Sequence, residues 1–350
     1  MSRFTIGIPT YNRAGYLKRS LQVALDQTEP DVAILVCDNA STDDTAEVVR
    51  GFGDRVRYHR NPTNLGATAN FMKVVELAET EYFSWLQDDD LIHRDFARRA
   101  TAALDSAPDI NAYACFSIRT PSPHTFFHAF LTGPAVPLGW MEGGLTTFDG
   151  RLVGPVSLFY SFGNPPALAY RAEALRQAVA TTRHRCVLYD ERILLAAAVV
   201  DAKVAVDPWP GAIFTDHPDQ DYKRIFRTEP NSQTSQWYVL ADAVGDLLKG
   251  RDDAWQAPVR DLFGATDLAH RLTWLRGYCP DPDAWRQANP IAATVWGLMI
   301  ETLPEWARAE FARPAGLFSR SARDRSRAIM KDLIPPLAWK VVRKVRRAGR

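Results

Sequence analysis

The chain of 350 residues is 46% hydrophobic and 24% charged, a composition that is typical of folded globular proteins and excludes a disordered chain. Its formal net charge of +1 gives no overall attraction to nucleic acid, so we expect no nucleic-acid partner. The four cysteines are scattered, and we expect neither a signal peptide nor a membrane-spanning helix. These features predict a cytoplasmic protein with two domains, or with one domain and an extension.

Strands and helices alternate along the first hundred residues. Apolar runs predict strands at 4–8, 32–37, 56–59 and 82–87. Apolar residues at helical spacing predict helices over 14–27, 42–51 and 67–79, the second of them opened by a capping box of Ser41 and Asp44. This alternation predicts an α/β fold with right-handed crossovers and a mainly parallel sheet flanked by helices.

The pattern is weaker after residue 104. It predicts a helix over 172–181, a second helix that begins near residue 190 and carries an apolar run to residue 200, and a short strand at 203–206. From about residue 231 the chain reads as helical and rich in tryptophan. We therefore predict an α/β domain over 1–230 and a helical C-terminal region over 231–350.

Polar segments follow three of the predicted strands, namely Pro9–Arg13, Asp38–Ser41 and Asp88–Asp90. Because ligands of such sheets bind beyond the carboxyl ends of the strands, we expect these segments to meet at one edge. Three consecutive carboxylates repel one another and are costly to bury. A hard divalent cation with oxygen ligands is the usual compensation, and such ions typically bridge substrate phosphates. The triplet therefore predicts a metal and phosphate site.

Four segments, taken together, resemble the inverting glycosyltransferases of family 2, which have the GT-A fold. They are Ile8–Arg13, Val36–Asp43, Asn64–Gly66 and Leu86–Asp90. The resemblance is strong over residues 4–96, weaker to about residue 220 and absent beyond. It implies a GT-A domain over 1–230 with a nucleotide-sugar half, 1–100, and an acceptor half, 101–230. One departure is Gln87, which stands where the family often has an acidic residue.

The resemblance implies a role for each matching residue. The nucleotide-sugar site would comprise Pro9, Thr10, Tyr11, Arg13, Asp38, Asn64, Gly66 and Asp88. Within it, Asp38 would accept a hydrogen bond from the nucleobase and Asp88 would approach the ribose. A divalent cation, Mn or Mg, would be held on the diphosphate by Asp89, Asp90 and His217. The catalytic base would be Asp190, with Glu191 as the alternative.

The activity implied is transfer of a hexosyl or deoxyhexosyl group from a nucleoside-diphosphate sugar to a saccharide or lipid-linked glycan, as in polysaccharide biosynthesis. Two alternatives stay open, which are a binding subunit without turnover and, less favoured, a sugar nucleotidyltransferase. The latter usually opens with a glycine-rich phosphate loop, whereas Pro9-Thr10-Tyr11 stands at that place here. A dinucleotide oxidoreductase is disfavoured because no G-x-G-x-x-G follows the first strand.

The last sixteen residues, 335–350, interleave apolar with basic residues and contain no acid. Basic amphipathic helices of this type lie on anionic membrane surfaces. We predict peripheral attachment to the inner face of the cell membrane, and the alternative is a frayed basic tail.

Overall fold

The structure is a computed structural model, and it describes residues 2–120, 144–158, 165–183, 190–217, 220, 223, 232–266, 268, 271–272 and 289–311. The chain divides into two compact units, 1–255 and 256–350. The predicted boundary near residue 230 therefore stays a prediction. The basic segment 335–350 lies outside the described residues, and its membrane role also stays a prediction.

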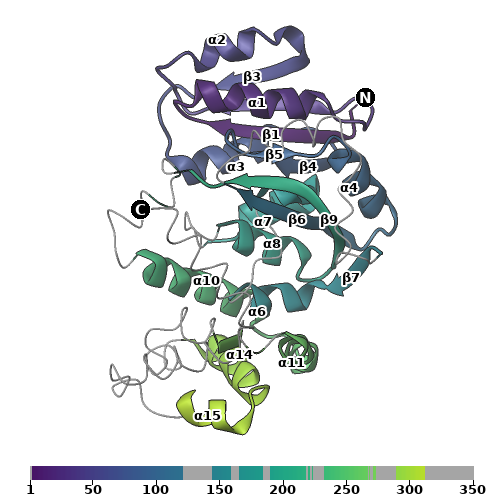
Figure 1. Cartoon of the computed structure of the whole chain (residues 1–350), viewed down its shortest axis with the longest axis vertical. Coiled ribbons are helices and arrows are strands. Elements are labelled where there is room, and N and C mark those ends of the chain that lie inside the picture. The colour runs from purple at the N-terminus through teal and green to yellow at the C-terminus, as the bar shows by residue number, and fades with distance from the viewer. Residues whose placement is uncertain are drawn as a thin grey trace, which may run out of the picture. The chain divides into compact units, whose positions relative to one another are not determined.

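The first hundred residues form the alternating elements that the sequence predicts (Figure 1). In chain order they are β1 Phe4–Thr10, α1 Ala14–Leu25, β2 Ala33–Asp38, α2 Thr45–Arg50, β3 Val56–Arg60, α3 Ala67–Leu77 and β4 Tyr82–Trp85. β1 pairs in parallel with both β2 and β4, and β2 pairs in parallel with β3. The carboxyl ends of these four strands therefore lie at one edge of the sheet.

The second half of the first unit adds antiparallel strands to this sheet. It comprises β5 Leu91–Ile92, α4 Phe96–Asp105, β6 Ile110–Thr120, β7 Thr146–Asp149, α6 Val153–Ser157, β8 Leu168–Arg171, α7 Ala172–Thr181, α8 Asp190–Val199, β9 Lys203–Thr215 and α10 Ser232–Leu248. Among the described residues the sheet has nine strands in the order β3-β2-β1-β4-β8-β6-β9-β5, with β7 beside β9. β8 runs antiparallel to both of its neighbours, so the sheet is parallel in its first half and mixed in its second.

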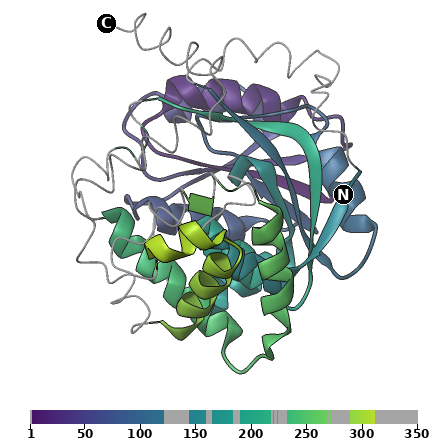
Figure 2. The same ribbon diagram turned by 60° about the horizontal axis from the view of Figure 1, so that its bottom comes forward.

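Both faces of the sheet are covered at its centre, which explains why the strands β1, β2 and β4 are largely apolar. Along β2, Ile34 and Val36 belong to the core that includes α1, whereas Leu35 and Cys37 belong to the core that includes α3, α7 and α8. Successive side chains of a strand point to opposite faces, so a strand that is buried on both sides reads as a continuous apolar run. Figure 2 shows α1, in purple, along one side of the strands.

The predicted capping box is wrong. α2 begins at Thr45, and its N-cap residue Asp44 makes no side-chain capping hydrogen bond. Ser41 Oγ instead accepts the backbone N–H of Asn12 at 2.8 Å, and Asp43 Oδ1 accepts the backbone N–H of Thr45 at 3.1 Å. Ser41 therefore ties the loop after β2 to the loop after β1, and the helix starts later because this tie holds Ser41 outside it.

The described part of the second unit is helical. α11 Gln256–Ala265, α14 Pro290–Glu301 and α15 Glu305–Phe311 form it, with Val259, Phe263 and Trp296 buried. Helix content after residue 231 is thus confirmed for the residues that are described. Over the same described ranges, no helix is both long enough and apolar enough to cross a membrane.

Candidate active site

The three polar segments predicted to converge lie together at the carboxyl edge of the parallel strands. Thr10, the last residue of β1, is in register with Asp38, the last residue of β2. The Thr10 hydroxyl donates to Asp88 Oδ2 at 2.7 Å, which links the end of β1 to the acidic triplet after β4. Tyr11 follows Thr10 and is 43% exposed, so its ring is accessible at this edge.

The three carboxylates of the triplet have different surroundings. Asp88 accepts from Thr10 and lies 3.6 Å from the Arg13 guanidinium, measured from Oδ1 to Nη1. Asp89 Oδ2 is shared by Arg13 Nη1 at 2.5 Å and His217 Nε2 at 2.8 Å. Asp88 and Asp89 therefore form one cluster with a guanidinium and an imidazole.

Asp90 is fully buried, and its side chain bonds to a different segment from those of Asp88 and Asp89. Its Oδ1 accepts the backbone N–H of Thr215 at 2.8 Å, and its Oδ2 has no partner among the described residues. Burial, reinforced by the neighbouring Asp89 charge, raises the pKa of Asp90 well above its ordinary value. Because Thr215 ends β9 two residues before His217, Asp90 joins the triplet to the strand that carries the histidine.

Helix α1 supplies two residues that the sequence did not single out. The Ser20 hydroxyl lies 2.8 Å from the backbone oxygen of Asp88 and 2.9 Å from that of Asp90, so it supports the turn that carries the triplet. The Tyr16 ring stacks on His217, with the centroids 4.7 Å apart. Ser20 lies three residues after Leu17 on the buried face of α1, and a lone hydroxyl on an apolar face is the signal that could have found it.

Asp38 is buried at the end of β2, and both of its oxygens are occupied. Oδ1 accepts the backbone N–H of Ser41 at 2.9 Å, while Oδ2 accepts the Tyr58 hydroxyl at 2.6 Å and lies 3.3 Å from Arg60 Nε. Burial and the hydrogen bond to Asp38 raise the pKa of Tyr58. β3 thus supplies a hydroxyl and a guanidinium to the predicted nucleobase pocket, and the sequence pattern did not predict either.

A chain of asparagine amides fixes the Asn64–Gly66 loop on the end of β2. Asn39 Nδ2 donates to Asn64 Oδ1 at 2.8 Å, and Asn39 Oδ1 accepts the backbone N–H of Leu65 at 2.8 Å. Gly66, the N-cap of α3, has φ +84°, a left-handed conformation that favours glycine. The loop therefore has a defined place at the sheet edge, directly before α3. The sequence pattern did not predict this role of Asn39.

The predicted base, Asp190, lies next to this loop, although it comes from the second half of the first unit. Asp190 is the first residue of α8, and its Oδ2 accepts the Thr68 hydroxyl of α3 at 2.9 Å. The Glu191 side chain is 20% exposed and lies 4.0 Å from the Arg192 guanidinium. Burial raises the pKa of Glu191 to about 7, despite the opposing effect of Arg192.

The sequence of residues 5–164 matches the family model described as "Glycosyl transferase family 2". These residues are a family 2 glycosyltransferase domain. The abequosyltransferase RfbV of Salmonella typhimurium (strain LT2) is 37% identical over 114 residues, which cover 31% of this chain and 34% of that protein. An uncharacterized glycosyltransferase of Rickettsia felis is 35% identical over 92 residues, 25% of this chain and 15% of that protein. The matches therefore span about a third or less of each relative.

A solved structure of S. aureus TarS 1–349, in complex with UDP-GlcNAc, has a TM-score of 0.50 and 14% identity to this chain. The superposition covers 88% of this chain and 92% of that one. At this identity the likeness concerns the fold alone. The predicted GT-A fold is confirmed, and it places the polar edge described above in the glycosyltransferase domain.

Asp89 Oδ2 and His217 Nε2 are suited to supply two of the ligands of a divalent cation. Adjacent ligands of an octahedral Mg²⁺ lie about 3 Å apart, and Asp89 Oδ2 is 2.8 Å from His217 Nε2. Within the described ranges, no group of three or more His, Cys, Asp or Glu side chains could hold a metal ion. A cation here would therefore take its other ligands from water and substrate phosphate, as Mg²⁺ usually does.

The raised pKa of Glu191 predicts a pH-dependent effect on the stability of the first compact unit, 1–255. Because the pKa rises from 4.5 to about 7, the folded state keeps a proton that the unfolded chain loses between these pH values. Stability therefore falls as the pH rises through this window. Glu191→Gln should raise the free energy of unfolding at pH 8 by on the order of 2 kcal/mol and leave it nearly unchanged at pH 4.

Urea unfolding at several pH values would measure this difference, with the exposed Glu47→Gln as the matched control. If the difference between Glu191→Gln and the unmodified chain were the same at pH 4 and pH 8, then burial of this carboxyl would not oppose its ionisation.

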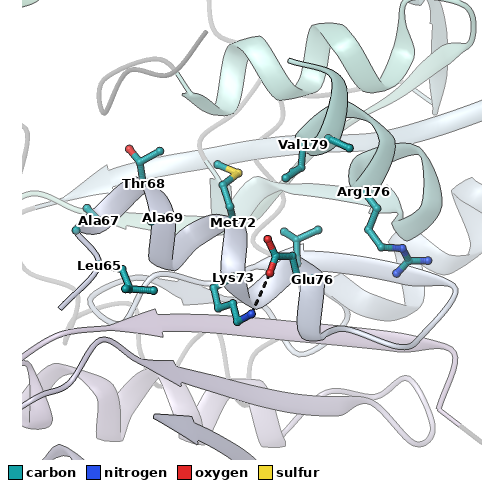
Figure 3. Close-up of a pocket in the computed structure, with 12 residues that line it drawn as sticks. Leu65, Ala67, Thr68, Ala69, Met72, Lys73, Glu76, Arg176 and Val179 are labelled. Carbon is teal, nitrogen blue, oxygen red and sulfur yellow. Dashed lines mark hydrogen bonds and ion pairs between the residues drawn. The ribbon is translucent and has the colours of Figure 1, made fainter. Parts of the chain in front are cut away.

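A hollow of about 1050 Å³ lies beside the Asn64–Gly66 loop, between α3 and α7 (Figure 3). Leu65, Met72 and Val179 give it apolar walls, and Arg176 and the Lys73–Glu76 ion pair line it as well. Of the predicted site residues, only Gly66 lines this hollow. The cluster of Asp88, Asp89 and Arg13 lies elsewhere on the domain.

Proposed function

We propose that this chain is an inverting glycosyltransferase that uses a nucleoside-diphosphate sugar, a divalent cation and a saccharide or lipid-linked glycan acceptor. The observation that carries the proposal is the arrangement at one sheet edge. Asp89 joins Arg13 and His217 there, and the Asn64–Gly66 loop leads directly to Thr68, which contacts Asp190. The family 2 match and the relative named as an abequosyltransferase support glycosyl transfer.

The donor is proposed to bind along the ends of β1 and β2. Pro9, Thr10, Tyr11 and Asp38 would surround the nucleobase, with Asp88 toward the ribose. The Arg13 guanidinium, whose side chain is 18% exposed, is suited to a phosphate because its planar fork pairs with phosphate oxygens. A Mn or Mg ion held by Asp89 and His217 would supply Lewis-acid stabilisation of the negative charge on the departing diphosphate.

Asp190 is proposed to take the proton of the acceptor hydroxyl as that oxygen attacks the anomeric carbon. The carbon–oxygen bond to the acceptor forms while the bond to the diphosphate breaks, so one displacement inverts the anomeric centre. A positioned carboxylate in this role typically contributes about 10²–10⁴-fold in rate. We assign Asp190 rather than Glu191 because Asp190 lies against α3, directly after the donor-side loop.

Asp90 is proposed to hold the site together rather than to contact the cation. It is buried, and its Oδ1 is engaged by the backbone of Thr215. This contact fixes the end of β9, two residues before His217. Within the triplet, Asp88 would then contact the ribose, Asp89 would bind the cation, and Asp90 would fix the strand that leads to His217.

The test is turnover with a panel of UDP, GDP, CDP and dTDP sugars and saccharide acceptors, each with Mn²⁺, Mg²⁺ or EDTA. We expect nucleoside diphosphate to be released and the product to show the inverted anomer by NMR. Release of pyrophosphate from a nucleoside triphosphate and a sugar phosphate would instead indicate a nucleotidyltransferase. Donor binding by thermal shift with no turnover on any acceptor would indicate a binding subunit. Full activity in EDTA would show that the reaction needs no divalent cation.

A further inference from the structure

One hydrogen bond connects the two halves of the glycosyltransferase domain at the proposed base. Thr68 Oγ1 donates to Asp190 Oδ2 at 2.9 Å, although 122 positions separate the two residues. Thr68 lies in the first turn of α3, and Asp190 is the first residue of α8. Figure 3 shows Thr68 on the first turn of α3, at the end nearest the Leu65 loop.

We propose that Thr68 is a positioning residue that orients the Asp190 carboxylate for proton abstraction; this inference rests on the proposed function. A hydroxyl that donates to an ionised carboxylate makes a charge-assisted bond that fixes the carboxylate's direction. A carboxylate has about four lone-pair sites, so the one bond from Thr68 does not by itself saturate it. The N-terminal ends of two helices, α3 and α8, also meet at this group.

The same contact sets the base relative to the donor loop. Thr68 follows Gly66 by two residues, and Asn39 holds Asn64 and Leu65 on the end of β2. A rigid path therefore runs from the strand that carries Asp38, through the asparagine-fixed loop and Thr68, to Asp190. Catalysis by a positioned group is sensitive to shifts of about 1 Å, so this path is where the distance between donor and base is controlled.

Thr68→Val and Thr68→Ser separate the hydroxyl from the shape of the side chain. Valine keeps the branched shape and removes the donor, so we expect kcat to fall roughly 10- to 30-fold, with the KM of the nucleotide sugar nearly unchanged. Serine keeps the donor and should restore most of kcat. Thr181→Val is the matched control, because the Thr181 hydroxyl bonds only to Gln177 O of its own helix in the contacts seen and is exposed.

A double-mutant cycle is the second measurement, and Thr68→Ala takes the place of Thr68→Val in it if the valine variant is poorly folded. The Thr68→Val change is made in Asp190→Asn, and the two single variants and the double variant are compared. If Thr68 acts through Asp190, the double variant should be no slower than Asp190→Asn alone. Thr68→Ala, which lacks both the hydroxyl and the γ-methyl group of threonine, repeats the comparison with a smaller side chain.

The possible outcomes test the positioning role and the proposed base separately. Normal kcat in Thr68→Val, or an equally low kcat in Thr68→Ser, would overturn the positioning role while leaving the proposed function intact. A multiplicative further loss in the double variant would do the same. Normal turnover in Asp190→Asn would instead remove the proposed base, and the positioning role would fall with it.

Discussion

Asp190→Asn is expected to lower kcat by about 10²–10⁴-fold while the dissociation constant of the nucleotide sugar stays nearly the same. The amide matches the carboxylate in shape but cannot accept the proton of the acceptor hydroxyl. Because the donor is proposed to bind at the ends of β1 and β2, its affinity should not depend on this charge. Initial rates of diphosphate release and calorimetric titration of the donor would measure the two effects separately.

The matched control is Asp201→Asn, an exposed acid just beyond the end of α8 that pairs with Arg251. It loses the same charge from the same region and should keep the normal rate. If Asp190→Asn and Asp201→Asn turned over equally fast, another group would have to act as the base. Glu191 would then be the first candidate, since burial brings its pKa to about 7, near the pH at which a general base works best.

Asp89→Asn is expected to weaken Mn²⁺ binding by at least about 100-fold in the presence of a nucleoside diphosphate. The change removes the negative charge that Arg13 and His217 share at one oxygen, Oδ2. It also leaves the Arg13 guanidinium without this partner, which is costly for a mostly buried ion pair. Calorimetric titration of Mn²⁺ into the protein with bound diphosphate would report the loss directly, without reference to turnover.

Asp44→Asn is the appropriate comparison, because Asp44 is an exposed acid at the same sheet edge and makes no side-chain cap. Unchanged Mn²⁺ affinity in Asp89→Asn, with the control also unchanged, would exclude Asp89 as a ligand. His217→Ala would then show whether the imidazole binds the ion without the carboxylate.

The parallel half of the sheet was predictable because its information is local. Apolar runs such as 32–37 are buried on both faces, and the alternating helices leave only right-handed crossovers between neighbouring strands. Polar segments that end such strands must then meet at one edge, as Thr10 and Asp88 do. The antiparallel insertion of β8 between β4 and β6 was not predictable in the same way, because β8 pairs with β4 between residues that are 87 to 89 positions apart.

The sequence by itself determined the order of strands and helices from β1 to β4, the edge at which the polar loops gather and the resemblance to family 2. Only the tertiary structure decided which atoms those residues contact. It pairs Asp89 with Arg13 and His217, turns Asp90 toward Thr215, closes Asp38 with Tyr58 and Arg60, and brings Thr68 to Asp190. The physical reason is that local patterns select backbone conformation, whereas the partner of a buried polar group is set by whichever distant segment the packed core brings within about 3 Å.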